Sequence, residues 1–195
     1  MSKVRADITM SLDGYISPAS GSVDELQNWV MNQDSVDAEI LERATAATGA
    51  VIMGRRLFDI VDAPGVWTSE MAYGAQPPGG QPFFVVSHSV PDDVRLTREL
   101  GMQFSFVDGL SSAVERARAA ATHGDVVIMG GGDVIGQAVE LGLVDELHLH
   151  LAPLVLGGGT PLFKDGTVHA YRQREVRASI NAVHLVYEQS IRVEE

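Results

Sequence analysis

A strand pattern opens the chain. Apolar residues occupy every second position from Val4 to Met10, and polar residues lie between them. This alternation predicts a half-buried β-strand, because successive side chains of a strand point to opposite faces. The pair Asp13-Gly14 ends the strand. Residues 14–32 are rich in Gly, Ser and Asn and predict an ordered loop.

Helices alternate with short apolar strands through the middle of the chain. Apolar residues recur at helical spacing after residue 35, so we expect a helix that Asp34 or Ser35 caps and that Gly49 ends, at about Thr48. A second helix opens at 54–60. Apolar runs are typical of buried parallel strands. They occur at 50–53, at 83–86 and at 125–129, where four apolar residues follow Asp125, with a weaker run at 103–107.

Two more helices are expected in the second half of the chain. Ser112 and Glu115 have the spacing of a capping box, which predicts a helix to about Thr122 that Gly124 closes. A short apolar helix follows three consecutive glycines further along. The Gly- and Pro-rich residues 64–82 predict an irregular surface flap.

The C-terminal third contains only strand patterns. Long strand-like runs occupy 146–155 and 183–193, and no helix is predicted between them. Strands that alternate with helices form parallel sheets, whereas strands that follow strands pair antiparallel. The sequence therefore predicts an α/β fold with a mixed, mostly parallel sheet and an antiparallel C-terminal edge. The 195 residues, 20.9 kDa in mass, fit a single domain over 1–195.

Charge and composition exclude several classes of function. The net charge is -12, which repels nucleic acid and anionic lipid at long range. The absence of cysteine excludes disulfide scaffolds, thiolate metal sites and a cysteine nucleophile. No segment approaches the roughly 20 apolar residues of a membrane span, and the first residues do not form a signal peptide. We therefore expect a cytoplasmic protein that binds neither nucleic acid nor membrane.

The sharpest local feature is Gly130-Gly131-Gly132, which lies between an apolar strand and a helix. Consecutive glycines let a bulky ligand approach the backbone, and a helix N-terminus presents free N–H groups and partial positive charge. The arrangement suits a pyrophosphate. The alternative is a tight strand-to-helix turn in which Asp133 caps the helix.

Gly54-Arg55-Arg56 repeats this arrangement, because an apolar strand ends, a glycine turns the chain and a helix begins. The planar guanidinium forms paired hydrogen bonds with phosphate oxygens, so two adjacent arginines in an acidic chain favour a phosphate site. Alternatively, both side chains face solvent or pair with Asp59 and Asp62.

A third strand ends at Ser87-His88-Ser89. Ligands of open α/β sheets bind beyond the carboxyl ends of parallel strands, where these groups would meet those at Arg55 and Gly130. The sequence thus predicts a dinucleotide site. Alone, His88 is equally consistent with an ordinary histidine in a surface loop.

Taken together, these segments resemble the dihydrofolate reductase-like family. The resemblance extends over nearly the whole chain and is greatest to the branch typified by the C-terminal reductase domain of the bifunctional riboflavin-pathway deaminase/reductase. No zinc motif of the deaminase half occurs, so the resemblance implies a stand-alone reductase domain. The matching segments are Met10-Ser11-Leu12-Asp13-Gly14-Tyr15-Ile16, Val51-Ile52-Met53-Gly54-Arg55-Arg56, Val85-Val86-Ser87, Ile128-Met129-Gly130-Gly131-Gly132 and 153–163.

The resemblance implies a three-layer fold with about eight strands and an NADPH site. Thr9 and Ile16 would flank the nicotinamide. The adenosine and its 2′-phosphate would lie among Arg55, Arg56, Ser87 and His88, close to Gly54. The pyrophosphate would rest after Gly130, on Gly131, Gly132, Asp133, Val134 and Ile135. Members of this branch are often homodimers, so we expect a homodimer here.

Three side chains are candidates for a proton donor. Asp37 stands nearest the position of the carboxylate that protonates dihydrofolate in the family, Asp7 lies on the polar face of the first strand, and His150 can supply a proton near neutral pH. His148 is two residues from His150 and points to the same side. The alternative is an ordinary strand face or a dimer contact. Metal binding by the two histidines lacks a third nearby ligand.

Three aromatic side chains, Trp29, Trp67 and Tyr73, could hold a flat heterocyclic substrate or anchor their own loops. The sequence as a whole predicts an NADPH-dependent reductase that transfers hydride to a small pterin, pyrimidine or other carbonyl or imine compound. The alternative is a dinucleotide-binding sensor or stress-response protein without turnover. The cofactor-binding groups would be the same in a reductase and in such a sensor, so the sequence does not distinguish the two functions.

Overall fold

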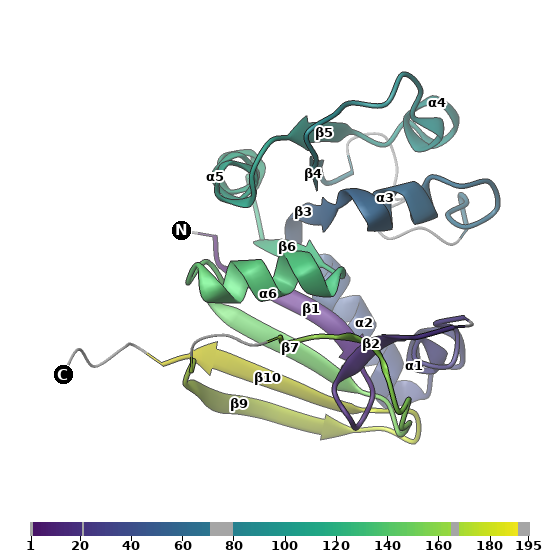
Figure 1. Cartoon of the computed structure of the whole chain (residues 1–195), viewed down its shortest axis with the longest axis vertical. Helices are drawn as coiled ribbons and strands as arrows, with labels where there is room; N and C mark the ends of the chain where they lie inside the picture. Colours follow the sequence, from purple (N-terminus) through teal and green to yellow (C-terminus); the bar gives the residue numbers. More distant parts are fainter. Residues whose placement is uncertain (1, 21, 71–79, 165–167, 191–195) are drawn as a thin grey trace.

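The computed structural model describes residues 2–20, 22–70, 80–164 and 168–190. An eight-stranded sheet with the order β5-β4-β3-β6-β1-β7-β10-β9 forms its centre (Figure 1). The first six strands in this order are parallel, and β10 runs antiparallel to both β7 and β9, which confirms the mixed sheet and its antiparallel edge. The strands are β1 Val4–Met10, β3 Thr48–Gly54, β4 Phe83–Val86, β5 Phe104–Val107, β6 Asp125–Met129, β7 Glu146–Leu151, β9 Tyr171–Ala178 and β10 Val183–Gln189.

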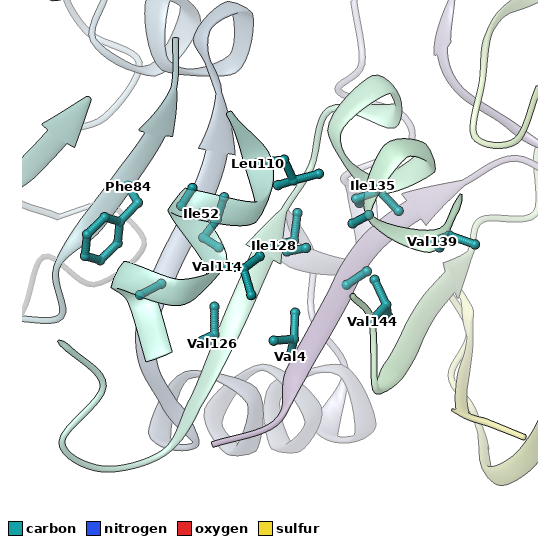
Figure 2. Packing of buried hydrophobic residues seen from close by; sticks show 14 of the residues in the cluster. Val4, Ile52, Phe84, Leu110, Val114, Val126, Ile128, Ile135, Val139 and Val144 are labelled. Atoms are coloured by element: carbon teal, nitrogen blue, oxygen red, sulfur yellow. The ribbon is translucent and has the colours of Figure 1, made fainter. Parts of the chain in front are cut away.

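Helices cover both faces of the sheet. The helices α5 and α6 pack on one face, where they contribute to a large apolar cluster with alternate residues of the central strands (Figure 2). On the opposite face, α3 and α4 cover β3 to β5, and α1 and α2 cover the half that contains β1, β7 and β10. The helices are α1 Asn28–Met31, α2 Ser35–Ala46, α3 Arg55–Val61, α4 Arg95–Leu100, α5 Leu110–Ala120 and α6 Gly132–Glu140.

The period-two pattern of β1 decides which groups face which layer. Ala6 and Ile8 enter the apolar cluster under α5 and α6. Arg5, Asp7 and Thr9 point to the other face, where the guanidinium of Arg5 bonds to the Ala44 carbonyl of α2 and to a nearby threonine hydroxyl. The polar residues of this central strand are therefore buried between the sheet and α2.

The loop predicted over 14–32 contains regular structure. Strand β2 (Tyr15–Pro18) pairs antiparallel with β8 (Gly159–Pro161), and α1 lies in the same segment. The segment is ordered, as predicted, but its strand and helix were not predicted, because the pairing partner of β2 is more than 140 residues away in sequence. The small sheet lies beside the carboxyl ends of β1 and β7 (Figure 1).

Two helix boundaries differ from the predictions. Asp34 caps α2 as expected, with Asp37 completing a capping box, but Gly49 lies inside β3. A Cβ at Gly49 would be 1.8 Å from the carbonyl oxygen of His123, so close backbone approach explains this glycine. The helix α5 begins at Leu110 after Gly109, and no side chain caps it, so the capping box expected at Ser112 is wrong.

Two elements have no counterpart in the predictions. The edge strand β9 carries mostly polar residues, and α4 follows a short surface segment. Of the flap predicted over 64–82, residues 71–79 lie outside the described part. In the described ranges, no helix has the length and apolar character needed to cross a membrane.

Candidate functional site

Three neighbouring strands end at the same edge of the sheet, and each carries groups predicted to bind a dinucleotide. The strands β3 and β6 pair in parallel, and so do β3 and β4. Gly54, Ser87 and Gly130 follow or end these strands and therefore lie along one edge. The predicted phosphate-binding segments are thus brought together by the fold.

The glycine turn after β6 has a backbone that favours glycine at two positions. Gly130 and Gly131 have φ angles of +63° and +81°, in the left-handed region that side chains with a Cβ rarely adopt. Gly131 is the residue that caps α6, and no side chain caps the helix, so Asp133 is not its N-cap. The N–H groups of Val134 and Ile135 bond to the Gly131 carbonyl, at 3.0 and 3.1 Å.

Neighbouring side chains explain two of the glycines without a ligand. A Cβ at Gly132 would lie 2.8 Å from Ile16, and a Cβ at Gly54 would lie 2.8 Å from Val134. Both glycines are therefore needed for close packing within the chain. At Gly131 the nearest atom to an added Cβ is 4.0 Å away, on Val134. Gly131 is the member of the turn that leaves open space in front of the backbone.

The two arginines at the start of α3 differ in their surroundings. Arg55 bonds to Asp59 at 2.7 Å and to the hydroxyl of Ser89 at 3.1 Å, so it is already partnered within the edge. Arg56 is exposed, and among the described residues no hydrogen bond or ion pair holds its side chain. The suggested pairing of these arginines with Asp62 does not occur, because Asp62 bonds to Arg95 and to the N-terminus of α4.

The turn after β4 is held by its own hydroxyl groups. Ser87 accepts a hydrogen bond from the Ser89 backbone N–H and donates to the Ser89 carbonyl. His88 is 92 % exposed and contacts Asp108 at 2.7 Å, as a histidine in a surface loop would. Asp133 likewise faces solvent and pairs with Lys164. This part of the edge is polar, open and mixed in charge.

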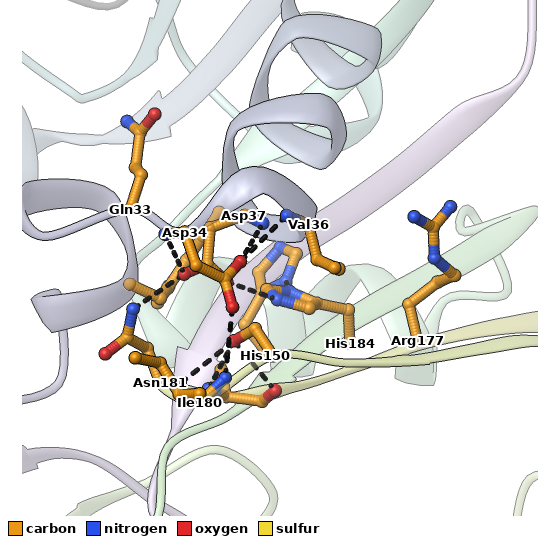
Figure 3. Close-up of polar contacts among 12 residues, drawn as sticks. Gln33, Asp34, Val36, Asp37, His150, Arg177, Ile180, Asn181 and His184 are labelled. Carbon is orange, nitrogen blue, oxygen red and sulfur yellow. Dashed lines mark hydrogen bonds and ion pairs between the residues drawn. The ribbon is translucent and has the colours of Figure 1, made fainter.

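A second group of predicted residues forms a buried chain of hydrogen bonds between the sheet and α2 (Figure 3). Asp7 Oδ1 lies 3.0 Å from Nε2 of His150, and His150 Nδ1 lies 2.7 Å from Nδ1 of His184. Nε2 of His184 is 2.9 Å from Asp37 Oδ1. Asn181 donates to the other oxygen of Asp37 at 2.7 Å. The three predicted proton donors thus belong to one network.

Trp29 covers this network. Its ring lies 4.2 Å from the His150 ring and 5.1 Å from the His184 ring, measured between centroids. Its indole N–H donates to the hydroxyl of Thr9 at 2.9 Å, so the Thr9 side chain is buried under the tryptophan. Ring contacts of this kind stabilise a charged imidazole.

The network shifts the pKa values of its members. Burial opposes ionisation of Asp7, but the facing His150 outweighs it and lowers the Asp7 pKa to about 2. Burial likewise opposes ionisation of Asp37, and hydrogen bonds from Ser179 and Asn181 outweigh it, so the pKa of Asp37 is also lowered. Burial lowers the pKa of His184, which its contact with Asp37 only partly offsets. Both carboxylates are therefore ionised at neutral pH.

The predicted substrate-binding aromatics do not gather at one place. Trp29 lies in the buried network, whereas Trp67 packs on Phe83 in the cluster under α3 and α4. Tyr73 lies outside the described residues. His148 points to the same side as His150, as predicted, and bonds to Glu146 at 3.2 Å. Within the described ranges, no group of three or more His, Asp or Glu side chains could hold a metal ion.

Sequence reasoning missed His184, Asn181 and Ser89. His184 lies in a predicted strand, but nothing in that strand pattern shows which residue it contacts. The antiparallel register of β10 with β7 places it beside His150. Asn181 is in the turn between β9 and β10, and β9 was not predicted. The only signal for Ser89 was its place beside Ser87 and His88.

Solved structures of known proteins share this fold. A putative riboflavin biosynthesis protein from Shewanella sp. PV-4 has a TM-score of 0.70 and 22 % identity, with 98 % of this chain and 100 % of that chain covered. A diaminohydroxyphosphoribosylaminopyrimidine deaminase/5-amino-6-(5-phosphoribosylamino)uracil reductase from Thermotoga maritima has a TM-score of 0.68 and 12 % identity, with 97 % of this chain and 57 % of that chain covered.

Sequence comparison identifies the family. The chain is 28 % identical over 167 residues to the uncharacterized protein YyaP of Bacillus subtilis (strain 168), with 84 % of this chain and 81 % of YyaP covered. The model of the RibD C-terminal domain matches residues 2–185, nearly the whole chain. This protein therefore belongs to the RibD C-terminal domain family.

Proposed function

We propose that this protein is an NADPH-dependent reductase that transfers hydride to a C=N or C=O carbon of a small pterin, pyrimidine or related compound. Its membership of the RibD C-terminal domain family supports an oxidoreductase. The observation that carries the proposal is the closeness of the buried hydrogen-bonded network to the glycine turn. Asp7 pairs in register with Met129 of β6, and the glycine turn begins at the next residue. A buried proton source therefore lies one strand from the predicted cofactor cradle.

The residues along the edge fit a dinucleotide phosphate. The first turn of α6 presents N–H groups that have no partner within the helix, and the open face of Gly131 leaves room for a pyrophosphate beside them. Arg55 reaches the Ser87 turn through Ser89, and the next residue, Arg56, is exposed and would be available to a 2′-phosphate. These positive groups offset the negative charge of the chain locally.

A bound NADPH supplies a hydride, and the protein supplies position and a proton. The hydride leaves an electron pair on the nitrogen or oxygen of the substrate, which then needs a proton. Asp7 is the member of the buried network with the largest exposed fraction, 20 % of its side chain. Asp7 is therefore the member through which the network can exchange a proton with its surroundings, while the Trp29 ring covers His150 and His184.

The pyrimidine class is our preferred substrate. The Thermotoga maritima protein is, by its name, a reductase of a phosphoribosylaminouracil, and this chain shares the reductase fold. Because the chain shares only 12 % identity with that protein, the assay below includes pterins and simple carbonyl compounds.

The test measures NADPH oxidation at 340 nm with the purified full-length chain, against ribosylaminopyrimidines, pterins and simple carbonyls. Fluorescence titration measures binding of NADPH separately. We expect binding and substrate-dependent oxidation. Binding without oxidation of any substrate would favour the alternative, a dinucleotide-binding sensor. If NADPH does not bind at all, both functions are wrong.

A further inference from the structure

Four ionisable side chains from four elements form the buried hydrogen-bonded chain described above. Asp7 comes from β1, His150 from β7, His184 from β10 and Asp37 from α2. Parallel pairing of β1 with β7 and antiparallel pairing of β10 with β7 bring their side chains to the same face. The order along the network is therefore carboxylate, imidazole, imidazole, carboxylate.

The geometry fixes the number of protons that the two imidazoles hold. The contact between the two Nδ1 atoms, at 2.7 Å, is a hydrogen bond only if one proton lies between them. Each Nε2 faces a carboxylate oxygen, at 3.0 and 2.9 Å, and must donate a proton to it. The pair thus holds three protons, one more than two neutral imidazoles. A fourth proton would place two N–H groups against each other.

Surrounding charges favour this single positive charge. The two ionised carboxylates lie at its ends, and the Trp29 ring faces His150. Burial lowers the pKa of His184 and repulsion from His150 lowers it further, so a second imidazolium is disfavoured at this distance. The other titratable or charged groups facing the pair are Arg5 on β1, His148 on β7, Asp34 on α2 and, on β9, Arg177, which is bound to Glu39.

Asp7 is the most exposed of the four side chains, and it pairs in register with Met129, the last residue before the glycine turn. The exposed fraction of the side chain is 5 % for His150, 3 % for His184 and 0 % for Asp37, compared with 20 % for Asp7. We propose that His150 and His184 hold one extra proton between them and that Asp7 passes the Nε2 proton of His150 to the substrate atom that gains the electron pair. This inference rests on the proposed reductase function, and it assigns His184 and Asp37 as positioning residues.

The proposed step balances in atoms and charge. Hydride from NADPH forms the new C–H bond, and the electron pair of the C=N or C=O bond moves to nitrogen or oxygen. The His150 Nε2 proton moves to Asp7, and Asp7 gives a proton to that atom. His150 then keeps its Nδ1 proton, so both imidazoles are neutral. The Asp7 carboxylate now faces an Nε2 lone pair, which favours uptake of a proton from solvent.

Histidine-selective ¹⁵N NMR tests the shared proton without any substrate. In the full-length chain between about pH 6 and 8, we expect three nitrogen-bound protons on the pair, with one strongly downfield signal from the Nδ1–Nδ1 bridge. In His184→Gln this signal should be lost, and in Asp7→Asn it should remain. Two neutral imidazoles, or two histidines that titrate independently, would overturn the proposal.

Kinetics with the best substrate test delivery of the proton. We expect His184→Gln to lower kcat by about 10²-fold or more and to leave the KM for NADPH unchanged, because the loss concerns proton transfer. Asp7→Asn should lower kcat similarly while the NMR signal persists.

His123→Gln is the matched control. It makes the same substitution at an exposed histidine in the connection between α5 and β6, outside the buried network. Its kcat should stay within about twofold of the parent. Equal losses in His123→Gln and His184→Gln would overturn the role of the pair in delivery. A parent chain that turns over no substrate would refute the proposed reductase function. The NMR result would still show whether the two histidines share a proton.

Discussion

At the scale of single residues, the same side chains serve stability and chemistry. Asp7 and Asp37 are buried or nearly so, and both remain ionised because imidazole and amide donors face them. Removing one partner from such a network leaves another group buried without a hydrogen bond, which costs more than the bond itself contributes. Substitutions that keep a polar group of similar shape are therefore the informative ones.

Asp7 should make stability depend on pH in the acid range. Its pKa is lowered from 3.8 to about 2 in the folded chain, so its ionised form stabilises the fold above about pH 4 by about 2 kcal/mol, and this contribution disappears as the pH falls to about 2. The difference in unfolding free energy between the parent and Asp7→Asn should shrink by that amount from pH 5 to pH 2. Urea denaturation of the parent and of Asp7→Asn at each pH gives the two unfolding free energies. A constant difference would contradict the lowered pKa.

Asp24→Asn provides the comparison for Asp7. It removes an exposed carboxylate on the surface between β2 and α1, outside the buried network. The difference between the parent and this variant should vary by less than about 0.5 kcal/mol over the same range of pH. A similar loss in both variants would attribute the effect to net charge instead of the contact with His150.

Arg55 and Arg56 should decide the choice between NADPH and NADH. Replacing both with alanine removes the charged donors beside the Ser87 turn, and the affinity for NADPH should fall by roughly ten- to a hundredfold while the affinity for NADH changes little. Fluorescence titration measures both. Arg98→Ala, on α4, removes another exposed arginine and should leave the preference intact. Equal affinities of the parent for the two cofactors would contradict the prediction.

At the scale of elements, most strands were predictable because burial shows directly in the sequence. Runs such as 83–86 and 126–129 are apolar throughout, and β1 shows clear alternation. The edge strand β9 has no such signal, because one face is solvated and its residues are mostly polar. The start of α5 was misjudged because burial of Leu110 overrides the local spacing at Ser112.

The site was predictable in part for the same reason. Glycine and arginine at strand ends are local signals, and the fold brings them to one edge. The buried network depends on pairing across 34 residues between His150 and His184, and across 147 residues between His184 and Asp37. No local pattern encodes such register. His150, Asp37 and Asp7 were found separately, and His184, which joins them, was not.

The glycine turn yields a prediction about cofactor binding. Gly131→Ala places a methyl group in the open space in front of the turn, and NADPH affinity should fall by about tenfold or more because the pyrophosphate needs that space. Gly142→Ala is the control for the loss of stability that a Cβ causes at a positive φ. Gly142 has a similar positive φ and open space around it, and it lies at the other end of α6. Gly132 is unsuitable, because its Cβ would clash with Ile16.

Titration with NADPH and thermal unfolding separate the two effects. Both alanine variants should lose about 1 kcal/mol of stability from the left-handed backbone, and only Gly131→Ala should lose affinity. If the two variants bind NADPH equally well, the turn is a structural connection and the pyrophosphate lies elsewhere.

At the scale of the whole molecule, the two faces of the sheet are covered unequally. α2 covers β7, β10 and β9 on one face, where Arg177 and Glu175 pair with it. On the opposite face, α6 lies over β1 and β7 and does not extend across β10 and β9 (Figure 1). Val183, Leu185 and Tyr187 of β10 and Val176 of β9 lie on that face. A cavity of about 380 Å³ lies next to them, lined by apolar and aromatic side chains such as Leu147, Phe163 and Tyr187 and by the polar side chains of Glu140, Lys164 and His169.

This uncovered face is where we expect the homodimer to form. Val176, Val183 and Phe163 expose 47, 38 and 46 % of their surface, and clusters of exposed apolar side chains on a sheet favour association. A stable interface buries about 800 Å² on each partner, which a sheet face of this kind can supply. Light scattering at micromolar concentration should therefore give twice the mass of 20.9 kDa.

Val176→Glu combined with Phe163→Glu should give the monomer, because burial of two unpaired carboxylates opposes the interface. Ile60→Glu changes an equally exposed residue on α3 and should leave the dimer intact. A mass near 20.9 kDa for the parent would refute the homodimer, and a dimer that survives the double substitution would place the interface on another face.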